Sequence, residues 1–375
     1  MKRPSRFFLA LAIFWFPLTA SANAGTPLMW ASMLHLIFGN MVLGVIEGLL
    51  LAWAFKLSKW KSIAILIVSN YASAWCGRLI ATDDLLGLQD LSIQNLWSGF
   101  LVLVALAFCL TLLLEFPFFW VALRSRERAL RRALKATPVV HAISYTMLFA
   151  WYWLASGTSM LTQLEPVSVQ EIPSMEGHSL YYLSTEGDRV FRIDLNDPDA
   201  RQVIMPVVAP DQNDRLFVHS NGDAAFDLYL LLESQGARKS LLLGSFAGKV
   251  ALEPRIAERG IEGARNTGGN FGTVPSLAAA SDWKFQTGFW ALEGISGWNT
   301  RNNQRMHYSL EMPFVSWPVR NATCLDGGFL IFQLGDDQIC WMHPETRKVA
   351  LLARGKGPVV SQSNGSPTAP AGNGV

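Results

Sequence analysis

Five polar residues interrupt long apolar stretches in the first half of the chain: Asn40, Glu47, Asn70, Glu115 and His141. Carboxyl groups and an imidazole can bind and release protons, and an asparagine amide can hydrogen-bond to either. Taking such groups out of water costs free energy unless they find partners, so in a membrane helix they usually face a protein interior. These residue types predict polar contacts between helices, and proton or ion chemistry where the carboxyl groups and the histidine take part.

Three roles remain open for these residues. In the favoured one, the amides of Asn40 and Asn70 and a neutral Glu47 hydrogen-bond between helices and only stabilise a helical bundle. In the second, Glu47, Glu115 and His141 take up and release a proton or an ion in turn. In the third, the same polar stripe docks another membrane subunit.

Neighbouring glycines and the position of each residue along its apolar stretch add detail to this prediction. Gly44 and Gly48 flank Glu47 on one helical face and would let a second helix approach closely. Counted from the ends of the apolar stretches, Glu47 lies near the middle of a bilayer, Glu115 lies deeper toward the cytoplasm, and His141 lies near the cytoplasmic end. The sequence thus predicts different depths for the three ionisable residues.

The elements that must position these residues are four apolar stretches, at about 33–57, 62–80, 97–123 and 138–160. Each is long enough to cross a hydrocarbon core of about 30 Å. Residues 1–24 contain basic residues, an apolar run and an Ala-Asn-Ala site, which are typical of a secretory signal peptide. Residues 25–160 are therefore predicted to form a four-helix transmembrane domain.

The charges between these stretches predict the orientation. The loops after the first and third stretches are basic, whereas the loop after the second contains three Asp residues. The positive-inside rule places the basic loops in the cytoplasm and the chain after about residue 160 outside it. We therefore expect a multi-pass protein of the bacterial inner (cytoplasmic) membrane, with membrane lipid as one partner and an extracytoplasmic C-terminal domain.

Composition excludes several classes of protein. Hydrophobic residues make up 50% of the chain and charged residues 16%, against about 25% in soluble domains, so neither a disordered chain nor a purely soluble one is expected. Nothing in the charge pattern indicates nucleic-acid binding. No HExxH, GxSxG, phosphate-binding or dinucleotide-binding motif is present. No catalytic residue, metal site or cofactor is therefore predicted, and an enzyme is the less favoured class.

Residues 161–360 consist of short alternating segments separated by Gly, Asp and Asn, a pattern typical of antiparallel β structure. Residues 179–203 and 327–360 share one plan: an apolar strand, a Gly-Asp hairpin, an aromatic-bearing strand, an acidic turn and a short last strand. These segments resemble the blades of bacterial extracytoplasmic β-propellers, and residues 215–249 form a weaker third copy. The resemblance implies a propeller-like all-β domain, with a β-sandwich as the alternative. The Gly-, Pro- and Ser-rich tail, 361–375, is expected to be disordered.

The cysteines fall into two pairs. Cys324 and Cys340 lie on the oxidising side of the predicted topology, where a disulfide is permitted. A hairpin or meander between them could bring the thiols together, so a structural disulfide and two separate buried thiols both remain open, with redox catalysis least favoured. Cys76 and Cys109 lie in apolar stretches, where a free cysteine behaves as a small hydrophobic residue.

Tryptophans are frequent in the β domain, at Trp283, Trp290, Trp298 and Trp317. Core packing explains most of them, but any that are exposed would anchor a binding surface.

The favoured function is therefore an extracytoplasmic domain, anchored by four helices, that binds a protein or envelope ligand in sensing, assembly or scaffolding. Its expected partner is another membrane or periplasmic protein. The alternative is a membrane-embedded enzyme or permease component that uses Glu47, Glu115 and His141.

Overall fold

The computed structural model describes residues 27–80, 91–222, 224–234, 237–264, 270–278, 281–288, 293–312 and 315–363. Contacts divide the chain into two compact units. The helical unit comprises Met1–Leu91, Asn95–Gly157 and Met312–Phe314, and the β unit comprises Ser92–Gln94, Thr158–Glu311 and Val315–Val375. The predicted signal peptide, the acidic loop and all but the first residues of the tail lie outside the described residues.

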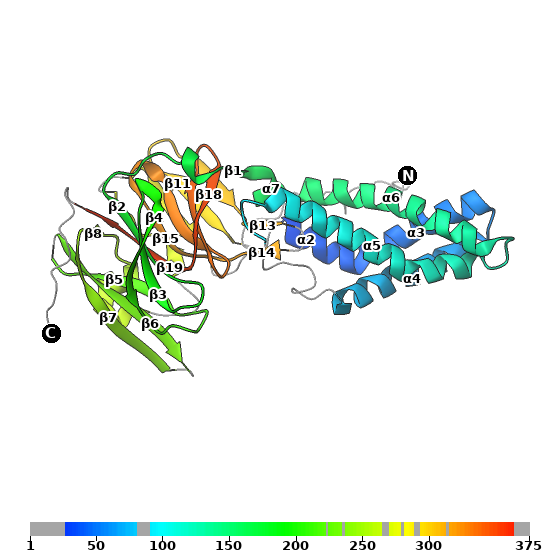
Figure 1. Cartoon of the computed structure of the whole chain (residues 1–375). Coiled ribbons are helices and arrows are strands. Elements are labelled where there is room, and N and C mark those ends of the chain that lie inside the picture. The colour runs from blue at the N-terminus through cyan, green and yellow to red at the C-terminus, as the bar shows by residue number, and fades with distance from the viewer. Residues whose placement is uncertain are drawn as a thin grey trace. The chain divides into compact units, whose positions relative to one another are not determined.

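Each of the four apolar stretches falls on a helix (Figure 1). α2 (Pro27–Leu34) continues through a π-helical turn, η3 (His35–Gly39), into α3 (Asn40–Phe55). The other long helices are α4 (Lys59–Ile80), α5 (Leu96–Leu123) and α6 (Ala129–Ala155). Two stretches of the described helices, Ala31–Phe55 and Leu96–Leu123, are long and apolar enough to cross a membrane.

The fourth long helix begins earlier than the apolar pattern suggests. α6 starts at Ala129 rather than near residue 138, because the basic segment after Arg128 is rich in Ala, Leu, Arg and Lys, which are good helix formers. Pro138 lies inside α6 without ending it. His141 is therefore about three turns from the start of the helix rather than at its end.

α3 and α4 pack backbone against backbone at two glycines. A Cβ atom on Gly44 would lie 2.5 Å from the Cα of Ile67, and one on Gly48 would lie 2.5 Å from the Cα of Ile63. Any larger residue would force the helices apart at these points. The close approach predicted from the glycine spacing is therefore present, and it brings Glu47 against α4.

The first two sheets of the β unit are ordered β4-β3-β2-β19-β8 and β5-β6-β7 (Figure 1). Their strands are β2 (His178–Leu183), β3 (Arg189–Asp194), β4 (Asp197–Pro206), β5 (Arg215–Ser220), β6 (Ala225–Ser234), β7 (Ala237–Ala247), β8 (Lys249–Val250) and β19 (Lys356–Gln362). The strand-turn-strand plan predicted for residues 179–203 corresponds to β2–β4, and that for residues 215–249 to β5–β7.

Two further sheets are ordered β12-β11-β10-β9 and β1-β18-β17-β16-β15. Their strands are β1 (Glu165–Pro166), β9 (Gly272–Thr273), β10 (Trp283–Thr287), β11 (Ile295–Asn299), β12 (Arg305–Tyr308), β15 (Val319–Cys324), β16 (Leu330–Leu334), β17 (Gln338–His343) and β18 (Lys348–Arg354). Smaller elements are α7 (Met160–Gln163), η5 (Val169–Glu171), α8 (Pro254–Arg259), η6 (Gly260–Gly263), β13 (Glu311–Met312), β14 (Val315–Ser316) and η7 (Asp326–Gly328).

An N-terminal helical region followed by a C-terminal all-β region with several sheets was predicted, and the structure confirms it. The described strands do not form a closed propeller. The two ends of the β unit are nevertheless joined, because β19 pairs with β2 and β1 pairs with β18. These pairings place β2 between β19 and β3 and place β18 between β1 and β17. The core beside them includes Tyr182 and Trp341.

Cys324 and Cys340 are both buried and both free. Cys324 ends β15 and Cys340 lies in β17, and β16 runs between these two strands. Neighbouring strands are about 4.8 Å apart, so β15 and β17 are roughly 10 Å apart, beyond the ~7 Å between Cα atoms that a disulfide can bridge. The sequence left open a structural disulfide or two separate buried thiols, and the structure has the separate buried thiols.

Candidate functional site

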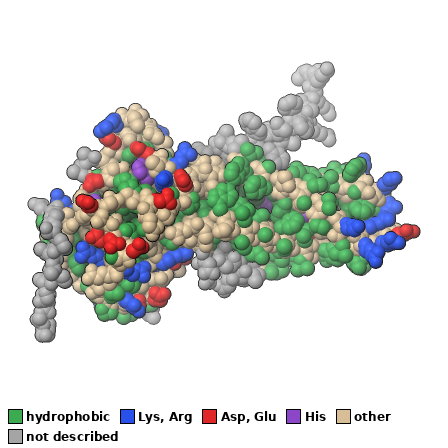
Figure 2. Space-filling model, turned by 45° about the horizontal axis from the view of Figure 1, so that its top comes forward, with side chains coloured by type: hydrophobic (Ala, Val, Ile, Leu, Met, Phe, Trp, Pro, Cys, Tyr) green, Lys and Arg blue, Asp and Glu red, His purple; other side chains and the backbone are tan. Residues whose placement is uncertain are grey.

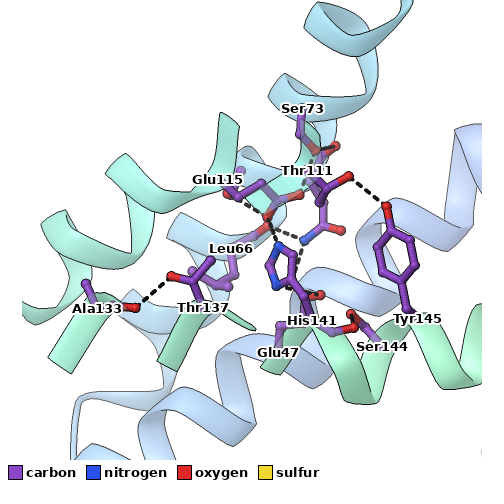
Figure 3. Close-up of polar contacts among 12 residues, drawn as sticks. Glu47, Leu66, Ser73, Thr111, Glu115, Ala133, Thr137, His141, Ser144 and Tyr145 are labelled. Carbon is purple, nitrogen blue, oxygen red and sulfur yellow. Dashed lines mark hydrogen bonds and ion pairs between the residues drawn. The ribbon is translucent and has the colours of Figure 1, made fainter. Parts of the chain in front are cut away.

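The helical unit brings Glu47, Glu115 and His141 together in its interior (Figure 3). They come from α3, α5 and α6, and each side chain is at most 2% exposed. One potential ligand atom from each residue lies within 4.8 Å of the others. Three ionisable groups that are far apart in sequence thus share one buried site, which we call the Glu–His–Glu centre.

The imidazole of His141 lies between the two carboxyl groups. Its Nδ1 is 3.8 Å from Oε1 of Glu47, and its Nε2 is 3.5 Å from Oε2 of Glu115. Charge-assisted hydrogen bonds are about 2.7–2.9 Å long, so both separations are too long for one. Both ring nitrogens are buried without a hydrogen-bond partner. An unsatisfied imidazole in such a place is costly and requires an explanation.

α4 supplies the groups that hold the two carboxylates. Nδ2 of Asn70 donates to Oε2 of Glu47 at 2.7 Å. The hydroxyls of Ser69 and Ser73 donate to Oε2 and Oε1 of Glu115 at 2.8 and 2.6 Å. All three donors lie on one face of α4, since they occupy positions i, i+1 and i+4. The orientation of each carboxylate is therefore fixed by a neighbouring helix.

α5 and α6 add a second layer of polar contact beside the centre. The hydroxyl of Tyr145, one turn after His141, lies 2.8 Å from that of Thr111, one turn before Glu115 (Figure 3). Ser144 is buried on the same side of α6 and donates to the carbonyl of His141 at 3.2 Å. These three residues were not predicted from the sequence, although their spacing from Glu115 and His141 places them on the same helical faces.

Apolar side chains close the centre on one side. The ring of Phe119 packs edge-on against His141, with ring centroids 5.3 Å apart. Phe119 belongs to a buried cluster that also contains Leu51, Leu66 and Leu123. This cluster excludes water from the neighbourhood of the carboxylates, which strengthens every electrostatic interaction there.

Asn40 is buried but lies apart from the centre. Its Nδ2 donates to the backbone carbonyl of Leu36 at 3.3 Å, within the π-helical turn that leads into α3. Four of the five polar residues predicted from the sequence therefore contribute to one site. The fifth, Asn40, hydrogen-bonds to the backbone of the preceding helical turn.

The tryptophans of the β unit do not form one exposed surface. Trp283 is buried on Phe285, and its Nε1 donates to Oε1 of Glu345 at 2.8 Å. Trp298 is 46% exposed and faces the opposite side of the sheet, because it pairs with the residue after Trp283. Trp317 is half-buried, and Trp290 lies outside the described residues.

The buried thiols also lack the environment of a reactive cysteine. Burial raises the pKa of Cys340 and that of Cys324 above the ordinary value. The thiolate is the nucleophile and the metal ligand, so a raised pKa reduces reactivity. This arrangement gives no support to redox chemistry at the pair.

One polar group of the β unit was not anticipated from the sequence. Arg215 donates from Nη2 to Oε2 of Glu253 at 3.0 Å, and Nη1 of the same guanidinium contacts the other carboxylate oxygen. Nearby, Nδ2 of Asn321 donates to Oε1 of Gln333 at 3.3 Å. That oxygen also accepts from the backbone amide of Gly357 at 2.9 Å. Nη1 of Arg215 also donates to Oδ1 of Asn321 at 3.4 Å, so these contacts tie β5, β15, β16 and β19 together, which is a structural role.

No protein-family model matches this chain, and no curated protein is significantly similar to it in sequence. Function is therefore inferred from the chemistry of the Glu–His–Glu centre and from the surface of the helices that carry it.

Proposed function

We propose that the protein is a multi-pass membrane protein whose helical unit is a permease or enzyme component, with the Glu–His–Glu centre as its ion-binding site. The observation that carries the proposal is the burial of Glu47, Glu115 and His141 at one point between three helices. Ionisable groups are costly to bury and usually mark functional sites, and here three of them lie together around ring nitrogens that have no hydrogen-bond partner.

The surface of the helical unit supports its insertion in a membrane. Among the described residues, every large hydrophobic side chain that is exposed lies on α2–α6 or η3, apart from Val203, Val208, Leu242 and Trp298. Figure 2 shows hydrophobic side chains covering this unit along its length, with Lys and Arg gathered at one end. Apolar side chains outside and ionisable ones inside are the arrangement expected of a protein whose solvent is lipid.

We include α4 and α6 among the membrane-crossing helices. Both are long enough, at 22 and 27 residues, but polar residues lower their hydropathy. The polar residues in the middle of these helices point to the Glu–His–Glu centre rather than to the surface. They are Ser69, Asn70 and Ser73 on α4 and His141 on α6. Their polarity is therefore no obstacle to a position in lipid.

The orientation follows from the basic end of the unit. Lys56, Lys59 and Lys61 lie in the connection between α3 and α4 and the first turn of α4, and the connection between α5 and α6 holds three Arg residues. These basic residues favour a cytoplasmic location. The chain leaves α6 on the opposite side of the membrane, so the β unit is extracytoplasmic in this proposal. Its consecutive antiparallel sheets and the return of β19 to β2 support a propeller-like arrangement that binds a protein or envelope ligand.

Carbodiimide labelling in native membranes tests the ion-binding site. Dicyclohexylcarbodiimide reacts with carboxyl groups in apolar surroundings, so we expect it to modify Glu47 or Glu115 in the full-length protein, as located by peptide mass spectrometry. Glu127 is exposed in the basic connection and is the matched control, which should react only with a water-soluble carbodiimide. Labelling of both buried carboxyls by the water-soluble reagent at the rate of Glu127 would contradict the proposal.

A further inference from the structure

We infer that the Glu–His–Glu centre binds a divalent transition-metal ion of the zinc class. The inference rests on the ion-binding role proposed above and names the ion. Its starting point is that one nitrogen or oxygen atom from each of Glu47, Glu115 and His141 lies within 4.8 Å of the others, at a place that solvent does not reach.

The distances within the centre fit metal ligands better than hydrogen-bond partners. Ligand atoms 2.0–2.2 Å from a tetrahedral zinc ion lie roughly 3.4 Å from one another. Nε2 of His141 and Oε2 of Glu115 are 3.5 Å apart. A direct hydrogen bond would bring these atoms to about 2.8 Å. The spacing is therefore that of two atoms that share a metal ion.

The imidazole is the second, independent indication. His141 is 1% exposed, both of its ring nitrogens lack a hydrogen-bond partner, and Figure 3 shows the ring pointing between the two carboxyl groups. Buried polar atoms are nearly always satisfied, so two ring nitrogens that each face a carboxylate without a hydrogen bond indicate a bound ion at this place.

Charge favours a divalent ion. Two carboxylates and a neutral imidazole carry a charge of −2, which is costly to bury away from water. A divalent cation brings the centre to zero, whereas a sodium or potassium ion would leave one negative charge uncompensated. Within the described residues, the side chains of Lys and Arg gather at the basic end of the unit and none contacts these carboxylates.

The donor types separate the zinc class from calcium and magnesium. Calcium takes six to eight oxygen ligands and magnesium prefers oxygen ligands in octahedral geometry, whereas imidazole suits zinc, iron, copper and nickel. Three protein ligands leave one tetrahedral position open, as in zinc sites that exchange water or substrate. The centre is therefore suited to a metal that exchanges rather than to a permanently closed structural site.

The donors from α4 complete the metal site. Asn70 orients Glu47, and Ser69 and Ser73 orient Glu115, each through a hydrogen bond to a carboxylate oxygen. Such outer partners fix ligand geometry, and their loss commonly weakens metal binding by about 10–100-fold. The hydroxyl of Ser73 is accordingly a positioning group, distinct from the three ligands.

The test uses the full-length chain in detergent, freed of any affinity tag and of bound metal by a chelator. Zinc chloride alone is titrated by calorimetry, and bound metal is counted after gel filtration. We expect one zinc ion per chain, no binding by His141→Ala or Glu115→Gln, and binding weakened about tenfold by Ser73→Ala. Cobalt provides a second readout, because a tetrahedral site with nitrogen and oxygen ligands gives intense visible absorption bands.

His35→Gln is the matched control. His35 lies in the same unit but bonds to the hydroxyl of Tyr152 at 2.8 Å and belongs to no metal-ligand group among the described residues. This variant should bind zinc as the unaltered protein does. Circular dichroism of every variant shows whether the fold is kept. Zinc should raise the unfolding midpoint of the unaltered chain but not that of Glu115→Gln, which separates loss of the site from loss of the fold.

Two results would overturn the inference. If zinc binds equally well to His141→Ala, or does not bind at all, the centre is not a transition-metal site. If calcium or magnesium competes at the same concentration as zinc, the class of metal is wrong. Carbodiimide labelling of Glu47 or Glu115 in a protein that binds no metal would leave the proposed ion-binding role in place, with the proton as the ion.

Discussion

At the residue scale, the centre shows why a charged group in apolar surroundings depends on its neighbours. Glu115 accepts two serine hydrogen bonds and Glu47 accepts one from an amide, while the imidazole of His141 makes none. The carboxylates are held in position before any ion arrives, so little ordering remains to be done on binding. Preorganisation of this kind raises affinity because the entropy of positioning the ligands is lost on folding.

How much of this site is visible in the sequence differs from residue to residue. Hydropathy alone shows that Glu47, Glu115 and His141 lie inside apolar stretches, which is unusual for ionisable residues. It does not show that the three side chains lie together, because they come from three helices and no local spacing links them. The sequence also predicted that the three residues lie at different depths in the bilayer, with His141 near the end of its helix. This is corrected for His141, because α6 begins at Ala129 and His141 therefore lies well inside the helix.

His307 offers a prediction on pH. It is half-buried in β12, its Nδ1 lies 2.9 Å from the hydroxyl of Ser296, and burial lowers its pKa below the ordinary value of 6.5. Just below pH 6.5 the unfolded chain therefore binds more protons at this position than the folded chain does. The free energy of unfolding should fall as the pH drops from 6.5 toward the lowered pKa.

Thermal unfolding of the full-length protein at pH 7.5 and pH 5.5 measures this effect. His307→Gln can keep a hydrogen bond to Ser296 but cannot titrate, so its unfolding midpoint should decrease less between the two pH values. His219, in β5, provides the control variant His219→Gln. An equal decrease for all three proteins would show that His307 does not contribute.

At the scale of elements, the sequence predicted the helices and hairpins well and their partners poorly. The turn residues of residues 179–203 specify β2–β4 locally, so the hairpins could be predicted. The pairing of β19 with β2 joins residues nearly two hundred positions apart, and no local pattern indicates it. The antiparallel meander β15-β16-β17 is present, but its middle strand keeps Cys324 and Cys340 apart.

The contact between α3 and α4 gives a prediction at this scale. Gly44→Ala places a Cβ atom 2.5 Å from the Cα of Ile67, so the helices must separate and Asn70 must withdraw from Glu47. We expect a loss of about 1–3 kcal/mol in the free energy of unfolding, the usual cost of overpacking a close contact. Detergent-mediated unfolding followed by circular dichroism measures it.

Gly77 on α4 is the matched control for this change. A Cβ atom there would meet only Leu110, at 3.9 Å, which is ordinary contact. Gly77→Ala should therefore leave stability unchanged or raise it slightly, because alanine is the better helix former by about 1 kcal/mol. Equal destabilisation by both substitutions would mean that α3 and α4 are not packed as described.

At the scale of the whole molecule, the two units have opposite surface chemistry. The helical unit exposes apolar side chains and hides ionisable ones, whereas the β unit has the buried apolar core and polar surface of a water-soluble domain. This difference between the two units agrees with the membrane location proposed above. The charge excess of each half agrees, with 13 Lys and Arg against 6 Asp and Glu before residue 160 and 18 against 23 from there on.

Single-cysteine labelling tests the resulting topology. Ser125 lies in the exposed basic connection between α5 and α6, and Glu186 lies in the exposed turn between β2 and β3. In a chain without its native cysteines, a membrane-impermeant maleimide added to cells with a permeable outer membrane should label Glu186→Cys and leave Ser125→Cys unlabelled. Ser125→Cys should react only after the inner membrane is opened, because three crossings from an extracytoplasmic start and the positive-inside rule place it in the cytoplasm. Labelling of both sites before the inner membrane is opened would exclude a membrane crossing by α6 and would contradict the proposed topology.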